Sequence, residues 1–253
     1  MIFSYLLAQP VIPAAESMTD LSLRPVVIVA GAGVAGAALT QQLAKQSVHV
    51  VLLDSNADAA AAVAAPLIQD GLSVDWQVID LLDVEQIVAL RDQLMNDLGR
   101  IDGVIHLVGG WCGSPTLDLA SAKNWIALSP PIVGTLAGLT AVLGEEIKAS
   151  DRGRIVMVTS TAARKPTAGN IAYASAKAAA EAWMQGVSHY FRGSNAAAVT
   201  VAVKALLTDQ MIAANPERDF SGFTHVTHLA EVITDLVIGD ASNGNRIDLT
   251  LTN

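Results

Sequence analysis

Tyr173 and Lys177 stand four residues apart in the alanine-rich stretch Tyr-Ala-Ser-Ala-Lys. If this stretch is helical, positions i and i+4 lie on one face of the helix. A nearby ammonium group stabilises a phenolate, so the spacing predicts that Lys177 lowers the pKa of Tyr173 from about 10 toward the working range. Such a tyrosine can act as a general acid or base.

Ser160 precedes this pair and ends an apolar stretch that is typical of a buried strand. Its hydroxyl can donate a hydrogen bond to a substrate carbonyl and stabilise developing oxyanion charge. We therefore predict a catalytic group of Ser160, Tyr173 and Lys177.

A glycine motif near the start of the chain indicates a phosphate-binding turn. Residues 31–36 read Gly31-Ala-Gly33-Val34-Ala-Gly36, after a predicted strand and at the start of a predicted helix. In this context the glycines permit a tight turn and a close approach of the backbone to a pyrophosphate. The helix N-terminus then offers unpaired N–H groups to the phosphates.

Two aspartates follow the next two predicted strands. Asp54 can accept hydrogen bonds from both ribose hydroxyls of an adenosine and would repel a 2′-phosphate, which favours NAD(H) over NADP(H). NADPH stays an alternative cofactor. Asp80 is placed to reach the adenine edge, or else to cap the approach to the next helix.

Short apolar strands alternate with helical stretches along the chain, which predicts parallel pairing through right-handed crossovers. The predicted strands cover Val26–Ala30, 48–53, 74–79, 103–108, 154–159, 199–203 and 246–251. The predicted helices cover 34–46, Ala57–Gln69, 84–98, 117–148, 171–192 and Val226–Ile238.

Three details of these helices follow from the residue types. Pro66 should end or kink the second helix, and Pro130-Pro131 should break the fourth. Asp83 should cap the third helix, with Gln86 as its capping-box partner. Both faces of the strands are apolar, so we expect a Rossmann-type, doubly wound α/β sheet of about seven parallel strands with helices on both faces.

Composition excludes several other classes of protein. The chain has 253 residues, 52% of them apolar and 15% charged, which excludes a disordered chain. A net charge of −9 argues against coating of nucleic acid or an anionic membrane. With Cys112 as its single cysteine the chain fits a reducing compartment, and we expect a cytoplasmic protein.

The first 24 residues differ from the rest. They contain Pro10 and Pro13 and carry no Lys or Arg before the first apolar run, so a secretory signal is not expected. We predict a flexible extension over residues 1–24, with Met18 as an alternative start, followed by one NAD(P)-binding catalytic domain over residues 25–253.

Together, the glycine motif, Ser160, Tyr173 and Lys177, in this order, resemble the short-chain dehydrogenase/reductase family over residues 25–253. The resemblance implies a nicotinamide cofactor, with Tyr173 passing a proton to or from the substrate. It also implies that Lys177 contacts the nicotinamide ribose, that Val108 and Gly109 line the cofactor site, and that the protein forms a homodimer or homotetramer.

Besides the glycine motif, three family motifs are altered here. His106-Leu-Val-Gly109 stands where the family has Asn-Asn-Ala-Gly, and Lys204-Ala205 replaces Pro-Gly after the sixth strand. The asparagine of the family's proton relay would fall near Pro131. The usual water-linked relay is therefore in doubt.

Two segments resemble the dihydropteridine reductase branch of the family. These are Gly109-Gly110-Trp111 and the stretch from Asn215 to Phe223, with Phe223 where that branch has tryptophan. The resemblance implies that Trp111 lines a flat heteroaromatic pocket. Ser160 is discordant, because that branch generally lacks the serine.

Three functions are carried forward. The first is reduction of a quinonoid dihydropterin-like substrate by NADH, and the second is the same chemistry on a ketone, an alcohol or an acyl thioester. The third is a non-catalytic nucleotide-binding protein of the same fold. His225 and His228 have the spacing of two metal ligands but no third partner, so we expect no metal site.

Overall fold

The computed structural model describes residues 24–250 of the chain, and its centre is a parallel β-sheet. Seven strands lie in the order β3-β2-β1-β4-β5-β6-β9, and every neighbouring pair is parallel. The strands are β1 Val26–Ala30, β2 His49–Asp54, β3 Val74–Val78, β4 Gly103–His106, β5 Arg154–Ser160, β6 Ala197–Val203 and β9 Arg246–Asp248.

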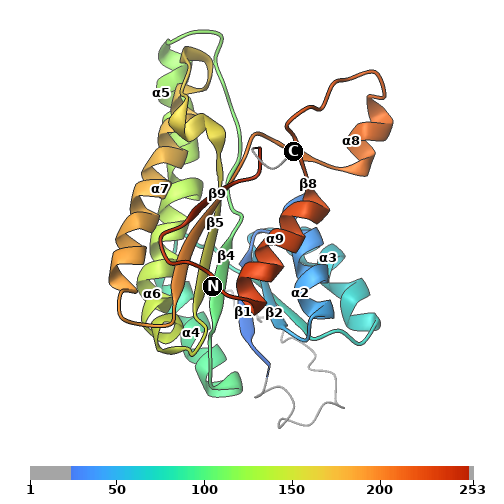
Figure 1. Cartoon of the computed structure of the whole chain (residues 1–253), viewed down its shortest axis with the longest axis vertical. Coiled ribbons are helices and arrows are strands. Elements are labelled where there is room, and N and C mark those ends of the chain that lie inside the picture. The colour runs from blue at the N-terminus through green and yellow to red at the C-terminus, as the bar shows by residue number, and fades with distance from the viewer. Residues whose placement is uncertain (1–23, 251–253) are drawn as a thin grey trace, which may run out of the picture.

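Helices cover both faces of the sheet (Figure 1). On one face lie α4 Val84–Leu98, α5 Leu119–Ser129, α6 Thr135–Ala149 and α7 Ile171–Tyr190, and on the other α2 Val34–Lys45, α3 Ala57–Gln69 and α9 Val226–Ile238. A separate apolar core fills each layer, one around Leu136 and Phe191 and the other around Leu39 and Ile233. The predicted Rossmann-type α/β sheet is confirmed.

The strand ends differ slightly from the prediction. β4 ends at His106 and β9 at Asp248, so both are shorter than expected, while β6 begins two residues earlier at Ala197. The expected strand over 103–108 is shorter because the chain turns away from the sheet to pass the glycine motif, where Gly109 has a positive φ of 155°.

Pro66 does not end its helix, whereas Pro130-Pro131 interrupts the α-helical pattern without ending the helical rod. α3 continues through Pro66 to Gln69. Pro66 is exposed, so the carbonyl of the preceding turn that loses its N–H partner can bond to water instead. At Pro130-Pro131 the helix changes to a π-helical turn, η1 Pro130–Gly134, between α5 and α6. The wider turn accommodates the two residues without N–H groups, and the helical rod stays continuous from Leu119 to Ala149.

The cap of α4 is confirmed in Asp83 but not in its partner. Asp83 accepts hydrogen bonds from the N–H groups of Glu85 and Gln86, and Gly99 ends the helix with a left-handed conformation. The Gln86 amide donates to the Asp83 carboxylate and accepts from the Asp80 N–H instead of closing a capping box.

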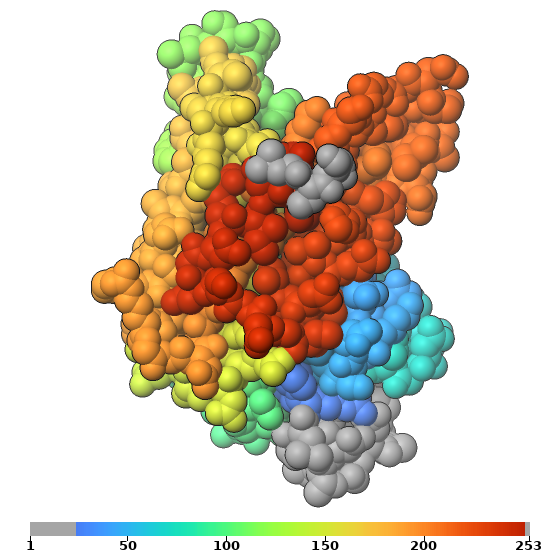
Figure 2. Space-filling model, viewed as in Figure 1, coloured from blue at the N-terminus to red at the C-terminus, as the bar shows by residue number. Residues whose placement is uncertain are grey.

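The segment after β6 contains structure that the sequence pattern did not indicate. It holds β7 Leu206–Leu207, α8 Asp209–Ala214 and β8 Thr224–His225, and β7 pairs with β8. In the space-filling view this segment projects from the body, and a notch separates it from the ends of α5 and α7 (Figure 2). Short turns η2 Thr161–Arg164 and η3 Ala168–Asn170 lie between β5 and α7.

The rod Leu119–Ala149 is long and apolar enough to span a membrane by length and composition alone. It packs within the helical layer, where Leu136, Leu139 and Leu143 are fully buried in the core. Core packing therefore accounts for the apolar residues of the α6 part of the rod, whereas Leu119 and Ile126 on α5 are exposed. The predicted extension over residues 1–24 lies outside the described residues apart from Arg24, as does the end of the last predicted strand.

Candidate active site

The residues singled out in the sequence gather at one edge of the sheet, where the parallel strands end. Gly31 follows β1, Asp54 ends β2, and Ser160 ends β5. His106 ends β4 and pairs in register with Met157, while Ser160 pairs with Val203 of β6. Ligands of doubly wound sheets bind outside this carboxyl edge.

The glycine motif forms a tight turn from β1 into α2. A side chain at Gly36 would place Cβ 1.9 Å from the carbonyl oxygen of Gly31, so close packing requires glycine there. At Gly33 no atom lies within 4 Å of an added Cβ, and Val34 beside it is 57% exposed. No side chain caps the N-terminus of α2. This open backbone with free N–H groups fits a pyrophosphate.

Asp54 holds this turn in place. Its carboxylate accepts hydrogen bonds from the Ala32 N–H at 2.7 Å and from the Asn56 N–H at 2.8 Å. Asp80 is exposed and accepts from the Leu82 N–H, so it caps the approach to α4, and its expected contact with adenine stays a prediction.

Ser160 and Tyr173 face each other at the end of β5. The Ser160 side chain is 4% exposed and accepts a hydrogen bond from the Ala162 N–H, and it is close enough to Tyr173 to lower the pKa of that phenol. The first turns of α7 carry Tyr173 beside this serine because Ala172 and Ala174 are small and buried.

Lys177 lies one turn further along α7 and is buried. Its Nζ donates a hydrogen bond of 2.8 Å to the carbonyl of Val158. Burial lowers the pKa of Lys177 to about 8, against a smaller opposing effect of Glu181. An added Cβ at Gly109 would lie 3.8 Å from this Nζ, so the turn after β4 borders the ammonium.

The pKa of Tyr173 moves opposite to expectation. Burial raises the pKa of this phenol, and the hydrogen bond with Ser160 lowers it by less. The i, i+4 spacing is present, but the Lys177 ammonium bonds to Val158 in β5. Desolvation therefore outweighs the expected electrostatic effect of Lys177.

A buried polar pair near Lys177 was not singled out as functional from the sequence. His106 Nε2 lies 2.8 Å from the Thr135 hydroxyl, which donates to the Pro131 carbonyl at 2.7 Å. Burial and the charge of Lys177 lower the pKa of His106 to about 3. The sequence feature that could have identified this pair is a histidine at the end of an otherwise apolar strand.

Trp111 and Cys112 follow the same turn. Trp111 is 71% exposed and its ring lies against Gly113, so its expected place in a substrate pocket stays a prediction. Cys112 is partly buried and borders a small depression with Ser114 and Gly169.

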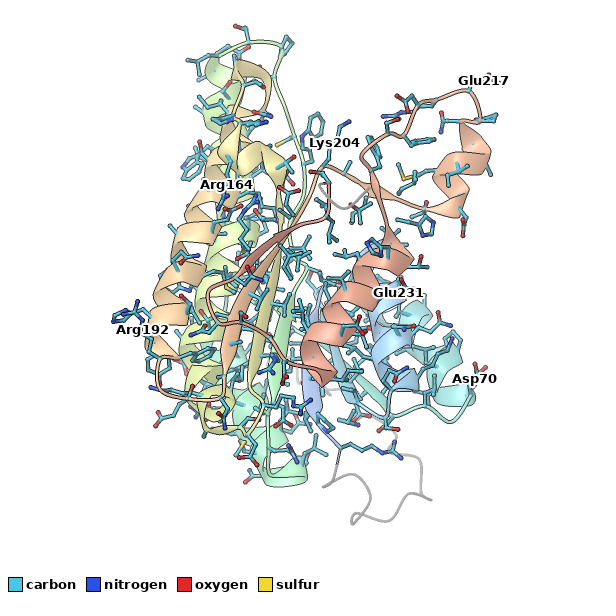
Figure 3. All side chains as sticks on the ribbon, viewed as in Figure 1. Asp70, Arg164, Arg192, Lys204, Glu217 and Glu231 are labelled. Carbon is cyan, nitrogen blue, oxygen red and sulfur yellow. The ribbon has the colours of Figure 1, made fainter. Side chains whose placement is uncertain are left out.

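The projecting segment places cations and aromatic rings near this edge. Lys204 follows the strand partner of Ser160, donates to the Ser221 carbonyl and lies 5.5 Å from the Phe223 ring centre. Arg218 lies over both Phe220 and Phe223. Figure 3 shows Lys204 where β6 leaves the sheet, with Glu217 at the far tip of the segment.

The two histidines that were weighed as metal ligands have other partners. His225 caps α9 by accepting from the Thr227 N–H and lies 3.4 Å from Asp209. His228 faces Glu231 on the helix surface. Within residues 24–250 no three histidine, cysteine or acidic side chains gather as metal ligands.

Comparison with known proteins identifies relatives over most of the chain. The family model described as short chain dehydrogenase matches residues 24–219. The 7alpha-hydroxysteroid dehydrogenase of Escherichia coli strain K12 is 27% identical over 187 residues, which cover 74% of this chain and 72% of that enzyme. D-threitol dehydrogenase of Mycolicibacterium smegmatis is 29% identical over 169 residues, covering 65% and 64%.

Solved structures share the fold. A gluconate 5-dehydrogenase from Burkholderia cenocepacia in complex with NADP and tartrate superposes with a TM-score of 0.77 at 19% identity, covering 92% of this chain and 96% of that one. NAD+-bound xylitol dehydrogenase gives a TM-score of 0.75 at 18% identity, covering 88% and 96%.

Proposed function

Because the chain belongs to the short-chain dehydrogenase/reductase family of NAD(P)-dependent oxidoreductases, we propose that it interconverts a small ketone and its secondary alcohol. The observation that carries this proposal is that Ser160, at the end of β5, lies beside Tyr173 at the same sheet edge as the glycine turn, with Tyr173 one helical turn from Lys177. The nicotinamide cofactor supplies or accepts the hydride.

Each residue of the group has a separate task. Ser160 donates its hydroxyl hydrogen to the substrate oxygen and orients it. Tyr173 gives a proton to that oxygen during reduction and takes it back during oxidation. Because burial raises its pKa, Tyr173 is protonated at neutral pH and ready to donate. The Lys177 ammonium stabilises the phenolate that forms.

Relatives favour an alcohol over a pterin as substrate. Two of them are named as dehydrogenases of a hydroxysteroid and of threitol, both of which carry hydroxyl groups. Ser160 suits a carbonyl or hydroxyl oxygen as its hydrogen-bond partner.

NAD(H) is the proposed cofactor, with NADPH as the alternative. Asp54 stands at the end of β2, beside the open glycine turn, where its carboxylate would repel a 2′-phosphate. Solved structures of the same fold are described with either NAD or NADP bound.

A quinonoid dihydropterin is the second candidate substrate. Phe220 and Phe223 form an edge-to-face pair with ring centres 5.6 Å apart, in the segment that resembles the dihydropteridine reductase branch. These rings and the exposed Trp111 offer stacking surfaces for a flat molecule. A non-catalytic nucleotide-binding role is the remaining alternative, and the intact Ser160, Tyr173 and Lys177 argue against it.

We also propose a cytoplasmic homodimer or homotetramer. Exposed apolar side chains gather on α5 and on the loop before it, namely Leu117 at 66%, Leu119 at 72%, Trp125 at 40% and Ile126 at 71%. A group of exposed apolar side chains like this one is typical of a surface that a second copy of the chain covers.

A substrate survey tests the proposed activity. Purified protein is offered NAD+ or NADP+ with secondary alcohols, a hydroxysteroid and threitol among them, and NADH with the matching ketones and with a quinonoid dihydropterin. The proposal expects saturable turnover of at least one alcohol–ketone pair, faster with NAD(H). Turnover of the pterin alone would favour the second candidate, and cofactor binding without any turnover would favour the non-catalytic alternative.

A further inference from the structure

The hydrogen bonds around His106 fix which of its ring nitrogens carries the proton. Thr135 has one hydroxyl hydrogen, and it donates this hydrogen to the Pro131 carbonyl at 2.7 Å. The Thr135 oxygen must therefore accept in its contact with His106 Nε2 at 2.8 Å. His106 is thus the neutral tautomer with its hydrogen on Nε2.

The other nitrogen, Nδ1, is then a bare acceptor inside the protein. His106 is 1% exposed, and its Nδ1 has no hydrogen-bond partner. A buried acceptor without a partner costs free energy, so its retention calls for a specific role.

Lys177 lies near the turn that holds this acceptor: a Cβ added at Gly109 would lie 3.8 Å from Lys177 Nζ and 3.3 Å from Ile132, the residue after Pro131. His106 pairs in register with Met157, whose side chain lies in the core beneath α6 and α7, and Lys177 enters that same layer from α7. Burial lowers the pKa of His106 most, and the charge of Lys177 lowers it further.

The ammonium of Lys177 has hydrogens to spare for this contact. Of its three N–H groups, one donates to the Val158 carbonyl. A Cβ added at Gly109 would lie 3.8 Å from Nζ, in van der Waals contact, so glycine at this position leaves that side of the ammonium uncovered by a side chain.

We propose that His106 is a positioning residue for Lys177: its Nδ1 accepts a hydrogen bond from a water that the Lys177 ammonium also binds, and this bridge orients the ammonium beside Tyr173. This inference rests on the proposed function. His106 would then have a role in the site close to the Pro130-Pro131 turn, which stands where the family has its relay asparagine.

His106 acts as an acceptor and not as a proton carrier. With a pKa of about 3 it stays neutral throughout the physiological range. In the described part of the chain, three titratable groups lie around the Lys177 ammonium. These are Glu181 and Tyr173 on the same helix and His106 from β4.

Two substitutions at His106 distinguish the effect of the hydrogen-bond acceptor from the effect of side-chain volume. His106→Asn keeps an acceptor near the position of Nδ1, whereas His106→Leu keeps comparable volume without one. We expect kcat to fall about tenfold in His106→Leu with little change in the KM of the cofactor, and to remain within a few-fold of wild type in His106→Asn. The pH dependence of kcat contains an apparent pKa for the ionisation of Lys177. This apparent pKa should fall in His106→Leu, because the ammonium loses a hydrogen-bond acceptor that favours its charged form.

Nitrogen-15 NMR of the imidazole tests the tautomer without any turnover. The His106 signals, identified by their loss in His106→Asn, should report hydrogen on Nε2 and no titration near neutral pH. Thr135→Val should remove this tautomer preference, and Thr140→Val is the matched control, because Thr140 also lies buried on α6 and also donates to a backbone carbonyl.

The outcomes are distinct. Wild-type kcat and pH profile in a folded His106→Leu would overturn the proposal, as would equal losses in the leucine and asparagine variants or hydrogen found on Nδ1. If wild-type protein turns over no substrate, the proposed function fails, while the NMR measurement still decides the tautomer.

Discussion

Burial sets the acidity of the catalytic side chains at the level of single residues. It raises the pKa of Tyr173 and lowers that of Lys177 to about 8, and both shifts favour the neutral forms. The spacing of the two residues could be read from the sequence because helical geometry is local. The direction of the Tyr173 shift could not, because desolvation depends on the residues that pack around it.

The buried Lys177 should make stability depend on pH. Its pKa is about 8 in the fold against 10.5 when exposed, so the unfolded chain binds more protons between these values and stability rises with pH across that window. Lys177→Met should remove this rise, which is at most about 3 kcal/mol, in denaturant unfolding at about pH 7 and about pH 10. The exposed Lys165→Met is the control, and an unchanged slope in Lys177→Met contradicts the assignment.

Asp54 should decide between the two nicotinamide cofactors. Asp54→Asn keeps an acceptor for the Ala32 N–H and removes the charge that repels a 2′-phosphate. We expect the ratio of kcat/KM for NADPH over NADH to rise about tenfold or more. The measurement is initial rates with both cofactors at a fixed substrate concentration, and an unchanged ratio would show that Asp54 does not read the ribose.

At the level of the elements, the turn from β1 into α2 contains two glycines with different roles: Gly36 is required for packing, and Gly33 is expected to contact the cofactor. Gly36→Ala would drive Cβ into the Gly31 carbonyl, and we expect a loss of several kcal/mol in the free energy of unfolding. Gly33→Ala meets nothing in the fold and should leave the Tm unchanged while weakening NADH binding about tenfold or more.

Thermal unfolding and NADH fluorescence titration check this pair. Gly186→Ala, another glycine with open space around it but far along α7, should leave NADH binding unchanged and raise the Tm slightly, because alanine favours a helix interior. Tight NADH binding by a folded Gly33→Ala would show that the cofactor does not approach the backbone there.

Elements with strong periodicity could be predicted, and those set by tertiary context could not. The residues of α9 match the expected range because its capping residue and apolar pattern coincide. The π-helical turn at Pro130-Pro131 could not be foreseen, since two adjacent prolines ordinarily end a helix, and here the chain stays helical through both. The short β7–β8 pairing and α8 lack any repeating apolar pattern and depend on contacts between distant residues.

For the whole molecule, every strand pair is parallel, as the alternation of strands and helices predicts, and this brings Gly31, Asp54 and Ser160 to one edge although they are far apart in sequence. That much of the site was predictable from the alternation of strands and helices. The substrate was not, because the segment between β6 and α9 that borders the edge takes its shape from packing.

The exposed apolar side of α5 predicts an assembly of copies. Ile126→Glu places a charge where Ile126 is 71% exposed, and we expect it to shift the protein to a smaller species. Light scattering after size-exclusion chromatography measures the mass. Ile212→Glu on α8 is the control and should leave the mass unchanged, and an unaltered mass in Ile126→Glu would place the contact elsewhere.

The most direct test of the account is kcat for the alcohol–ketone pair in two tyrosine variants on the same helix. Tyr173→Phe keeps the packing and removes the proton donor, whereas Tyr190→Phe alters an exposed tyrosine at the far end of α7. We predict a fall in kcat of about 10²- to 10⁴-fold for Tyr173→Phe and wild-type rates for Tyr190→Phe. Equal rates in both variants would contradict the role of Tyr173 as the general acid and base.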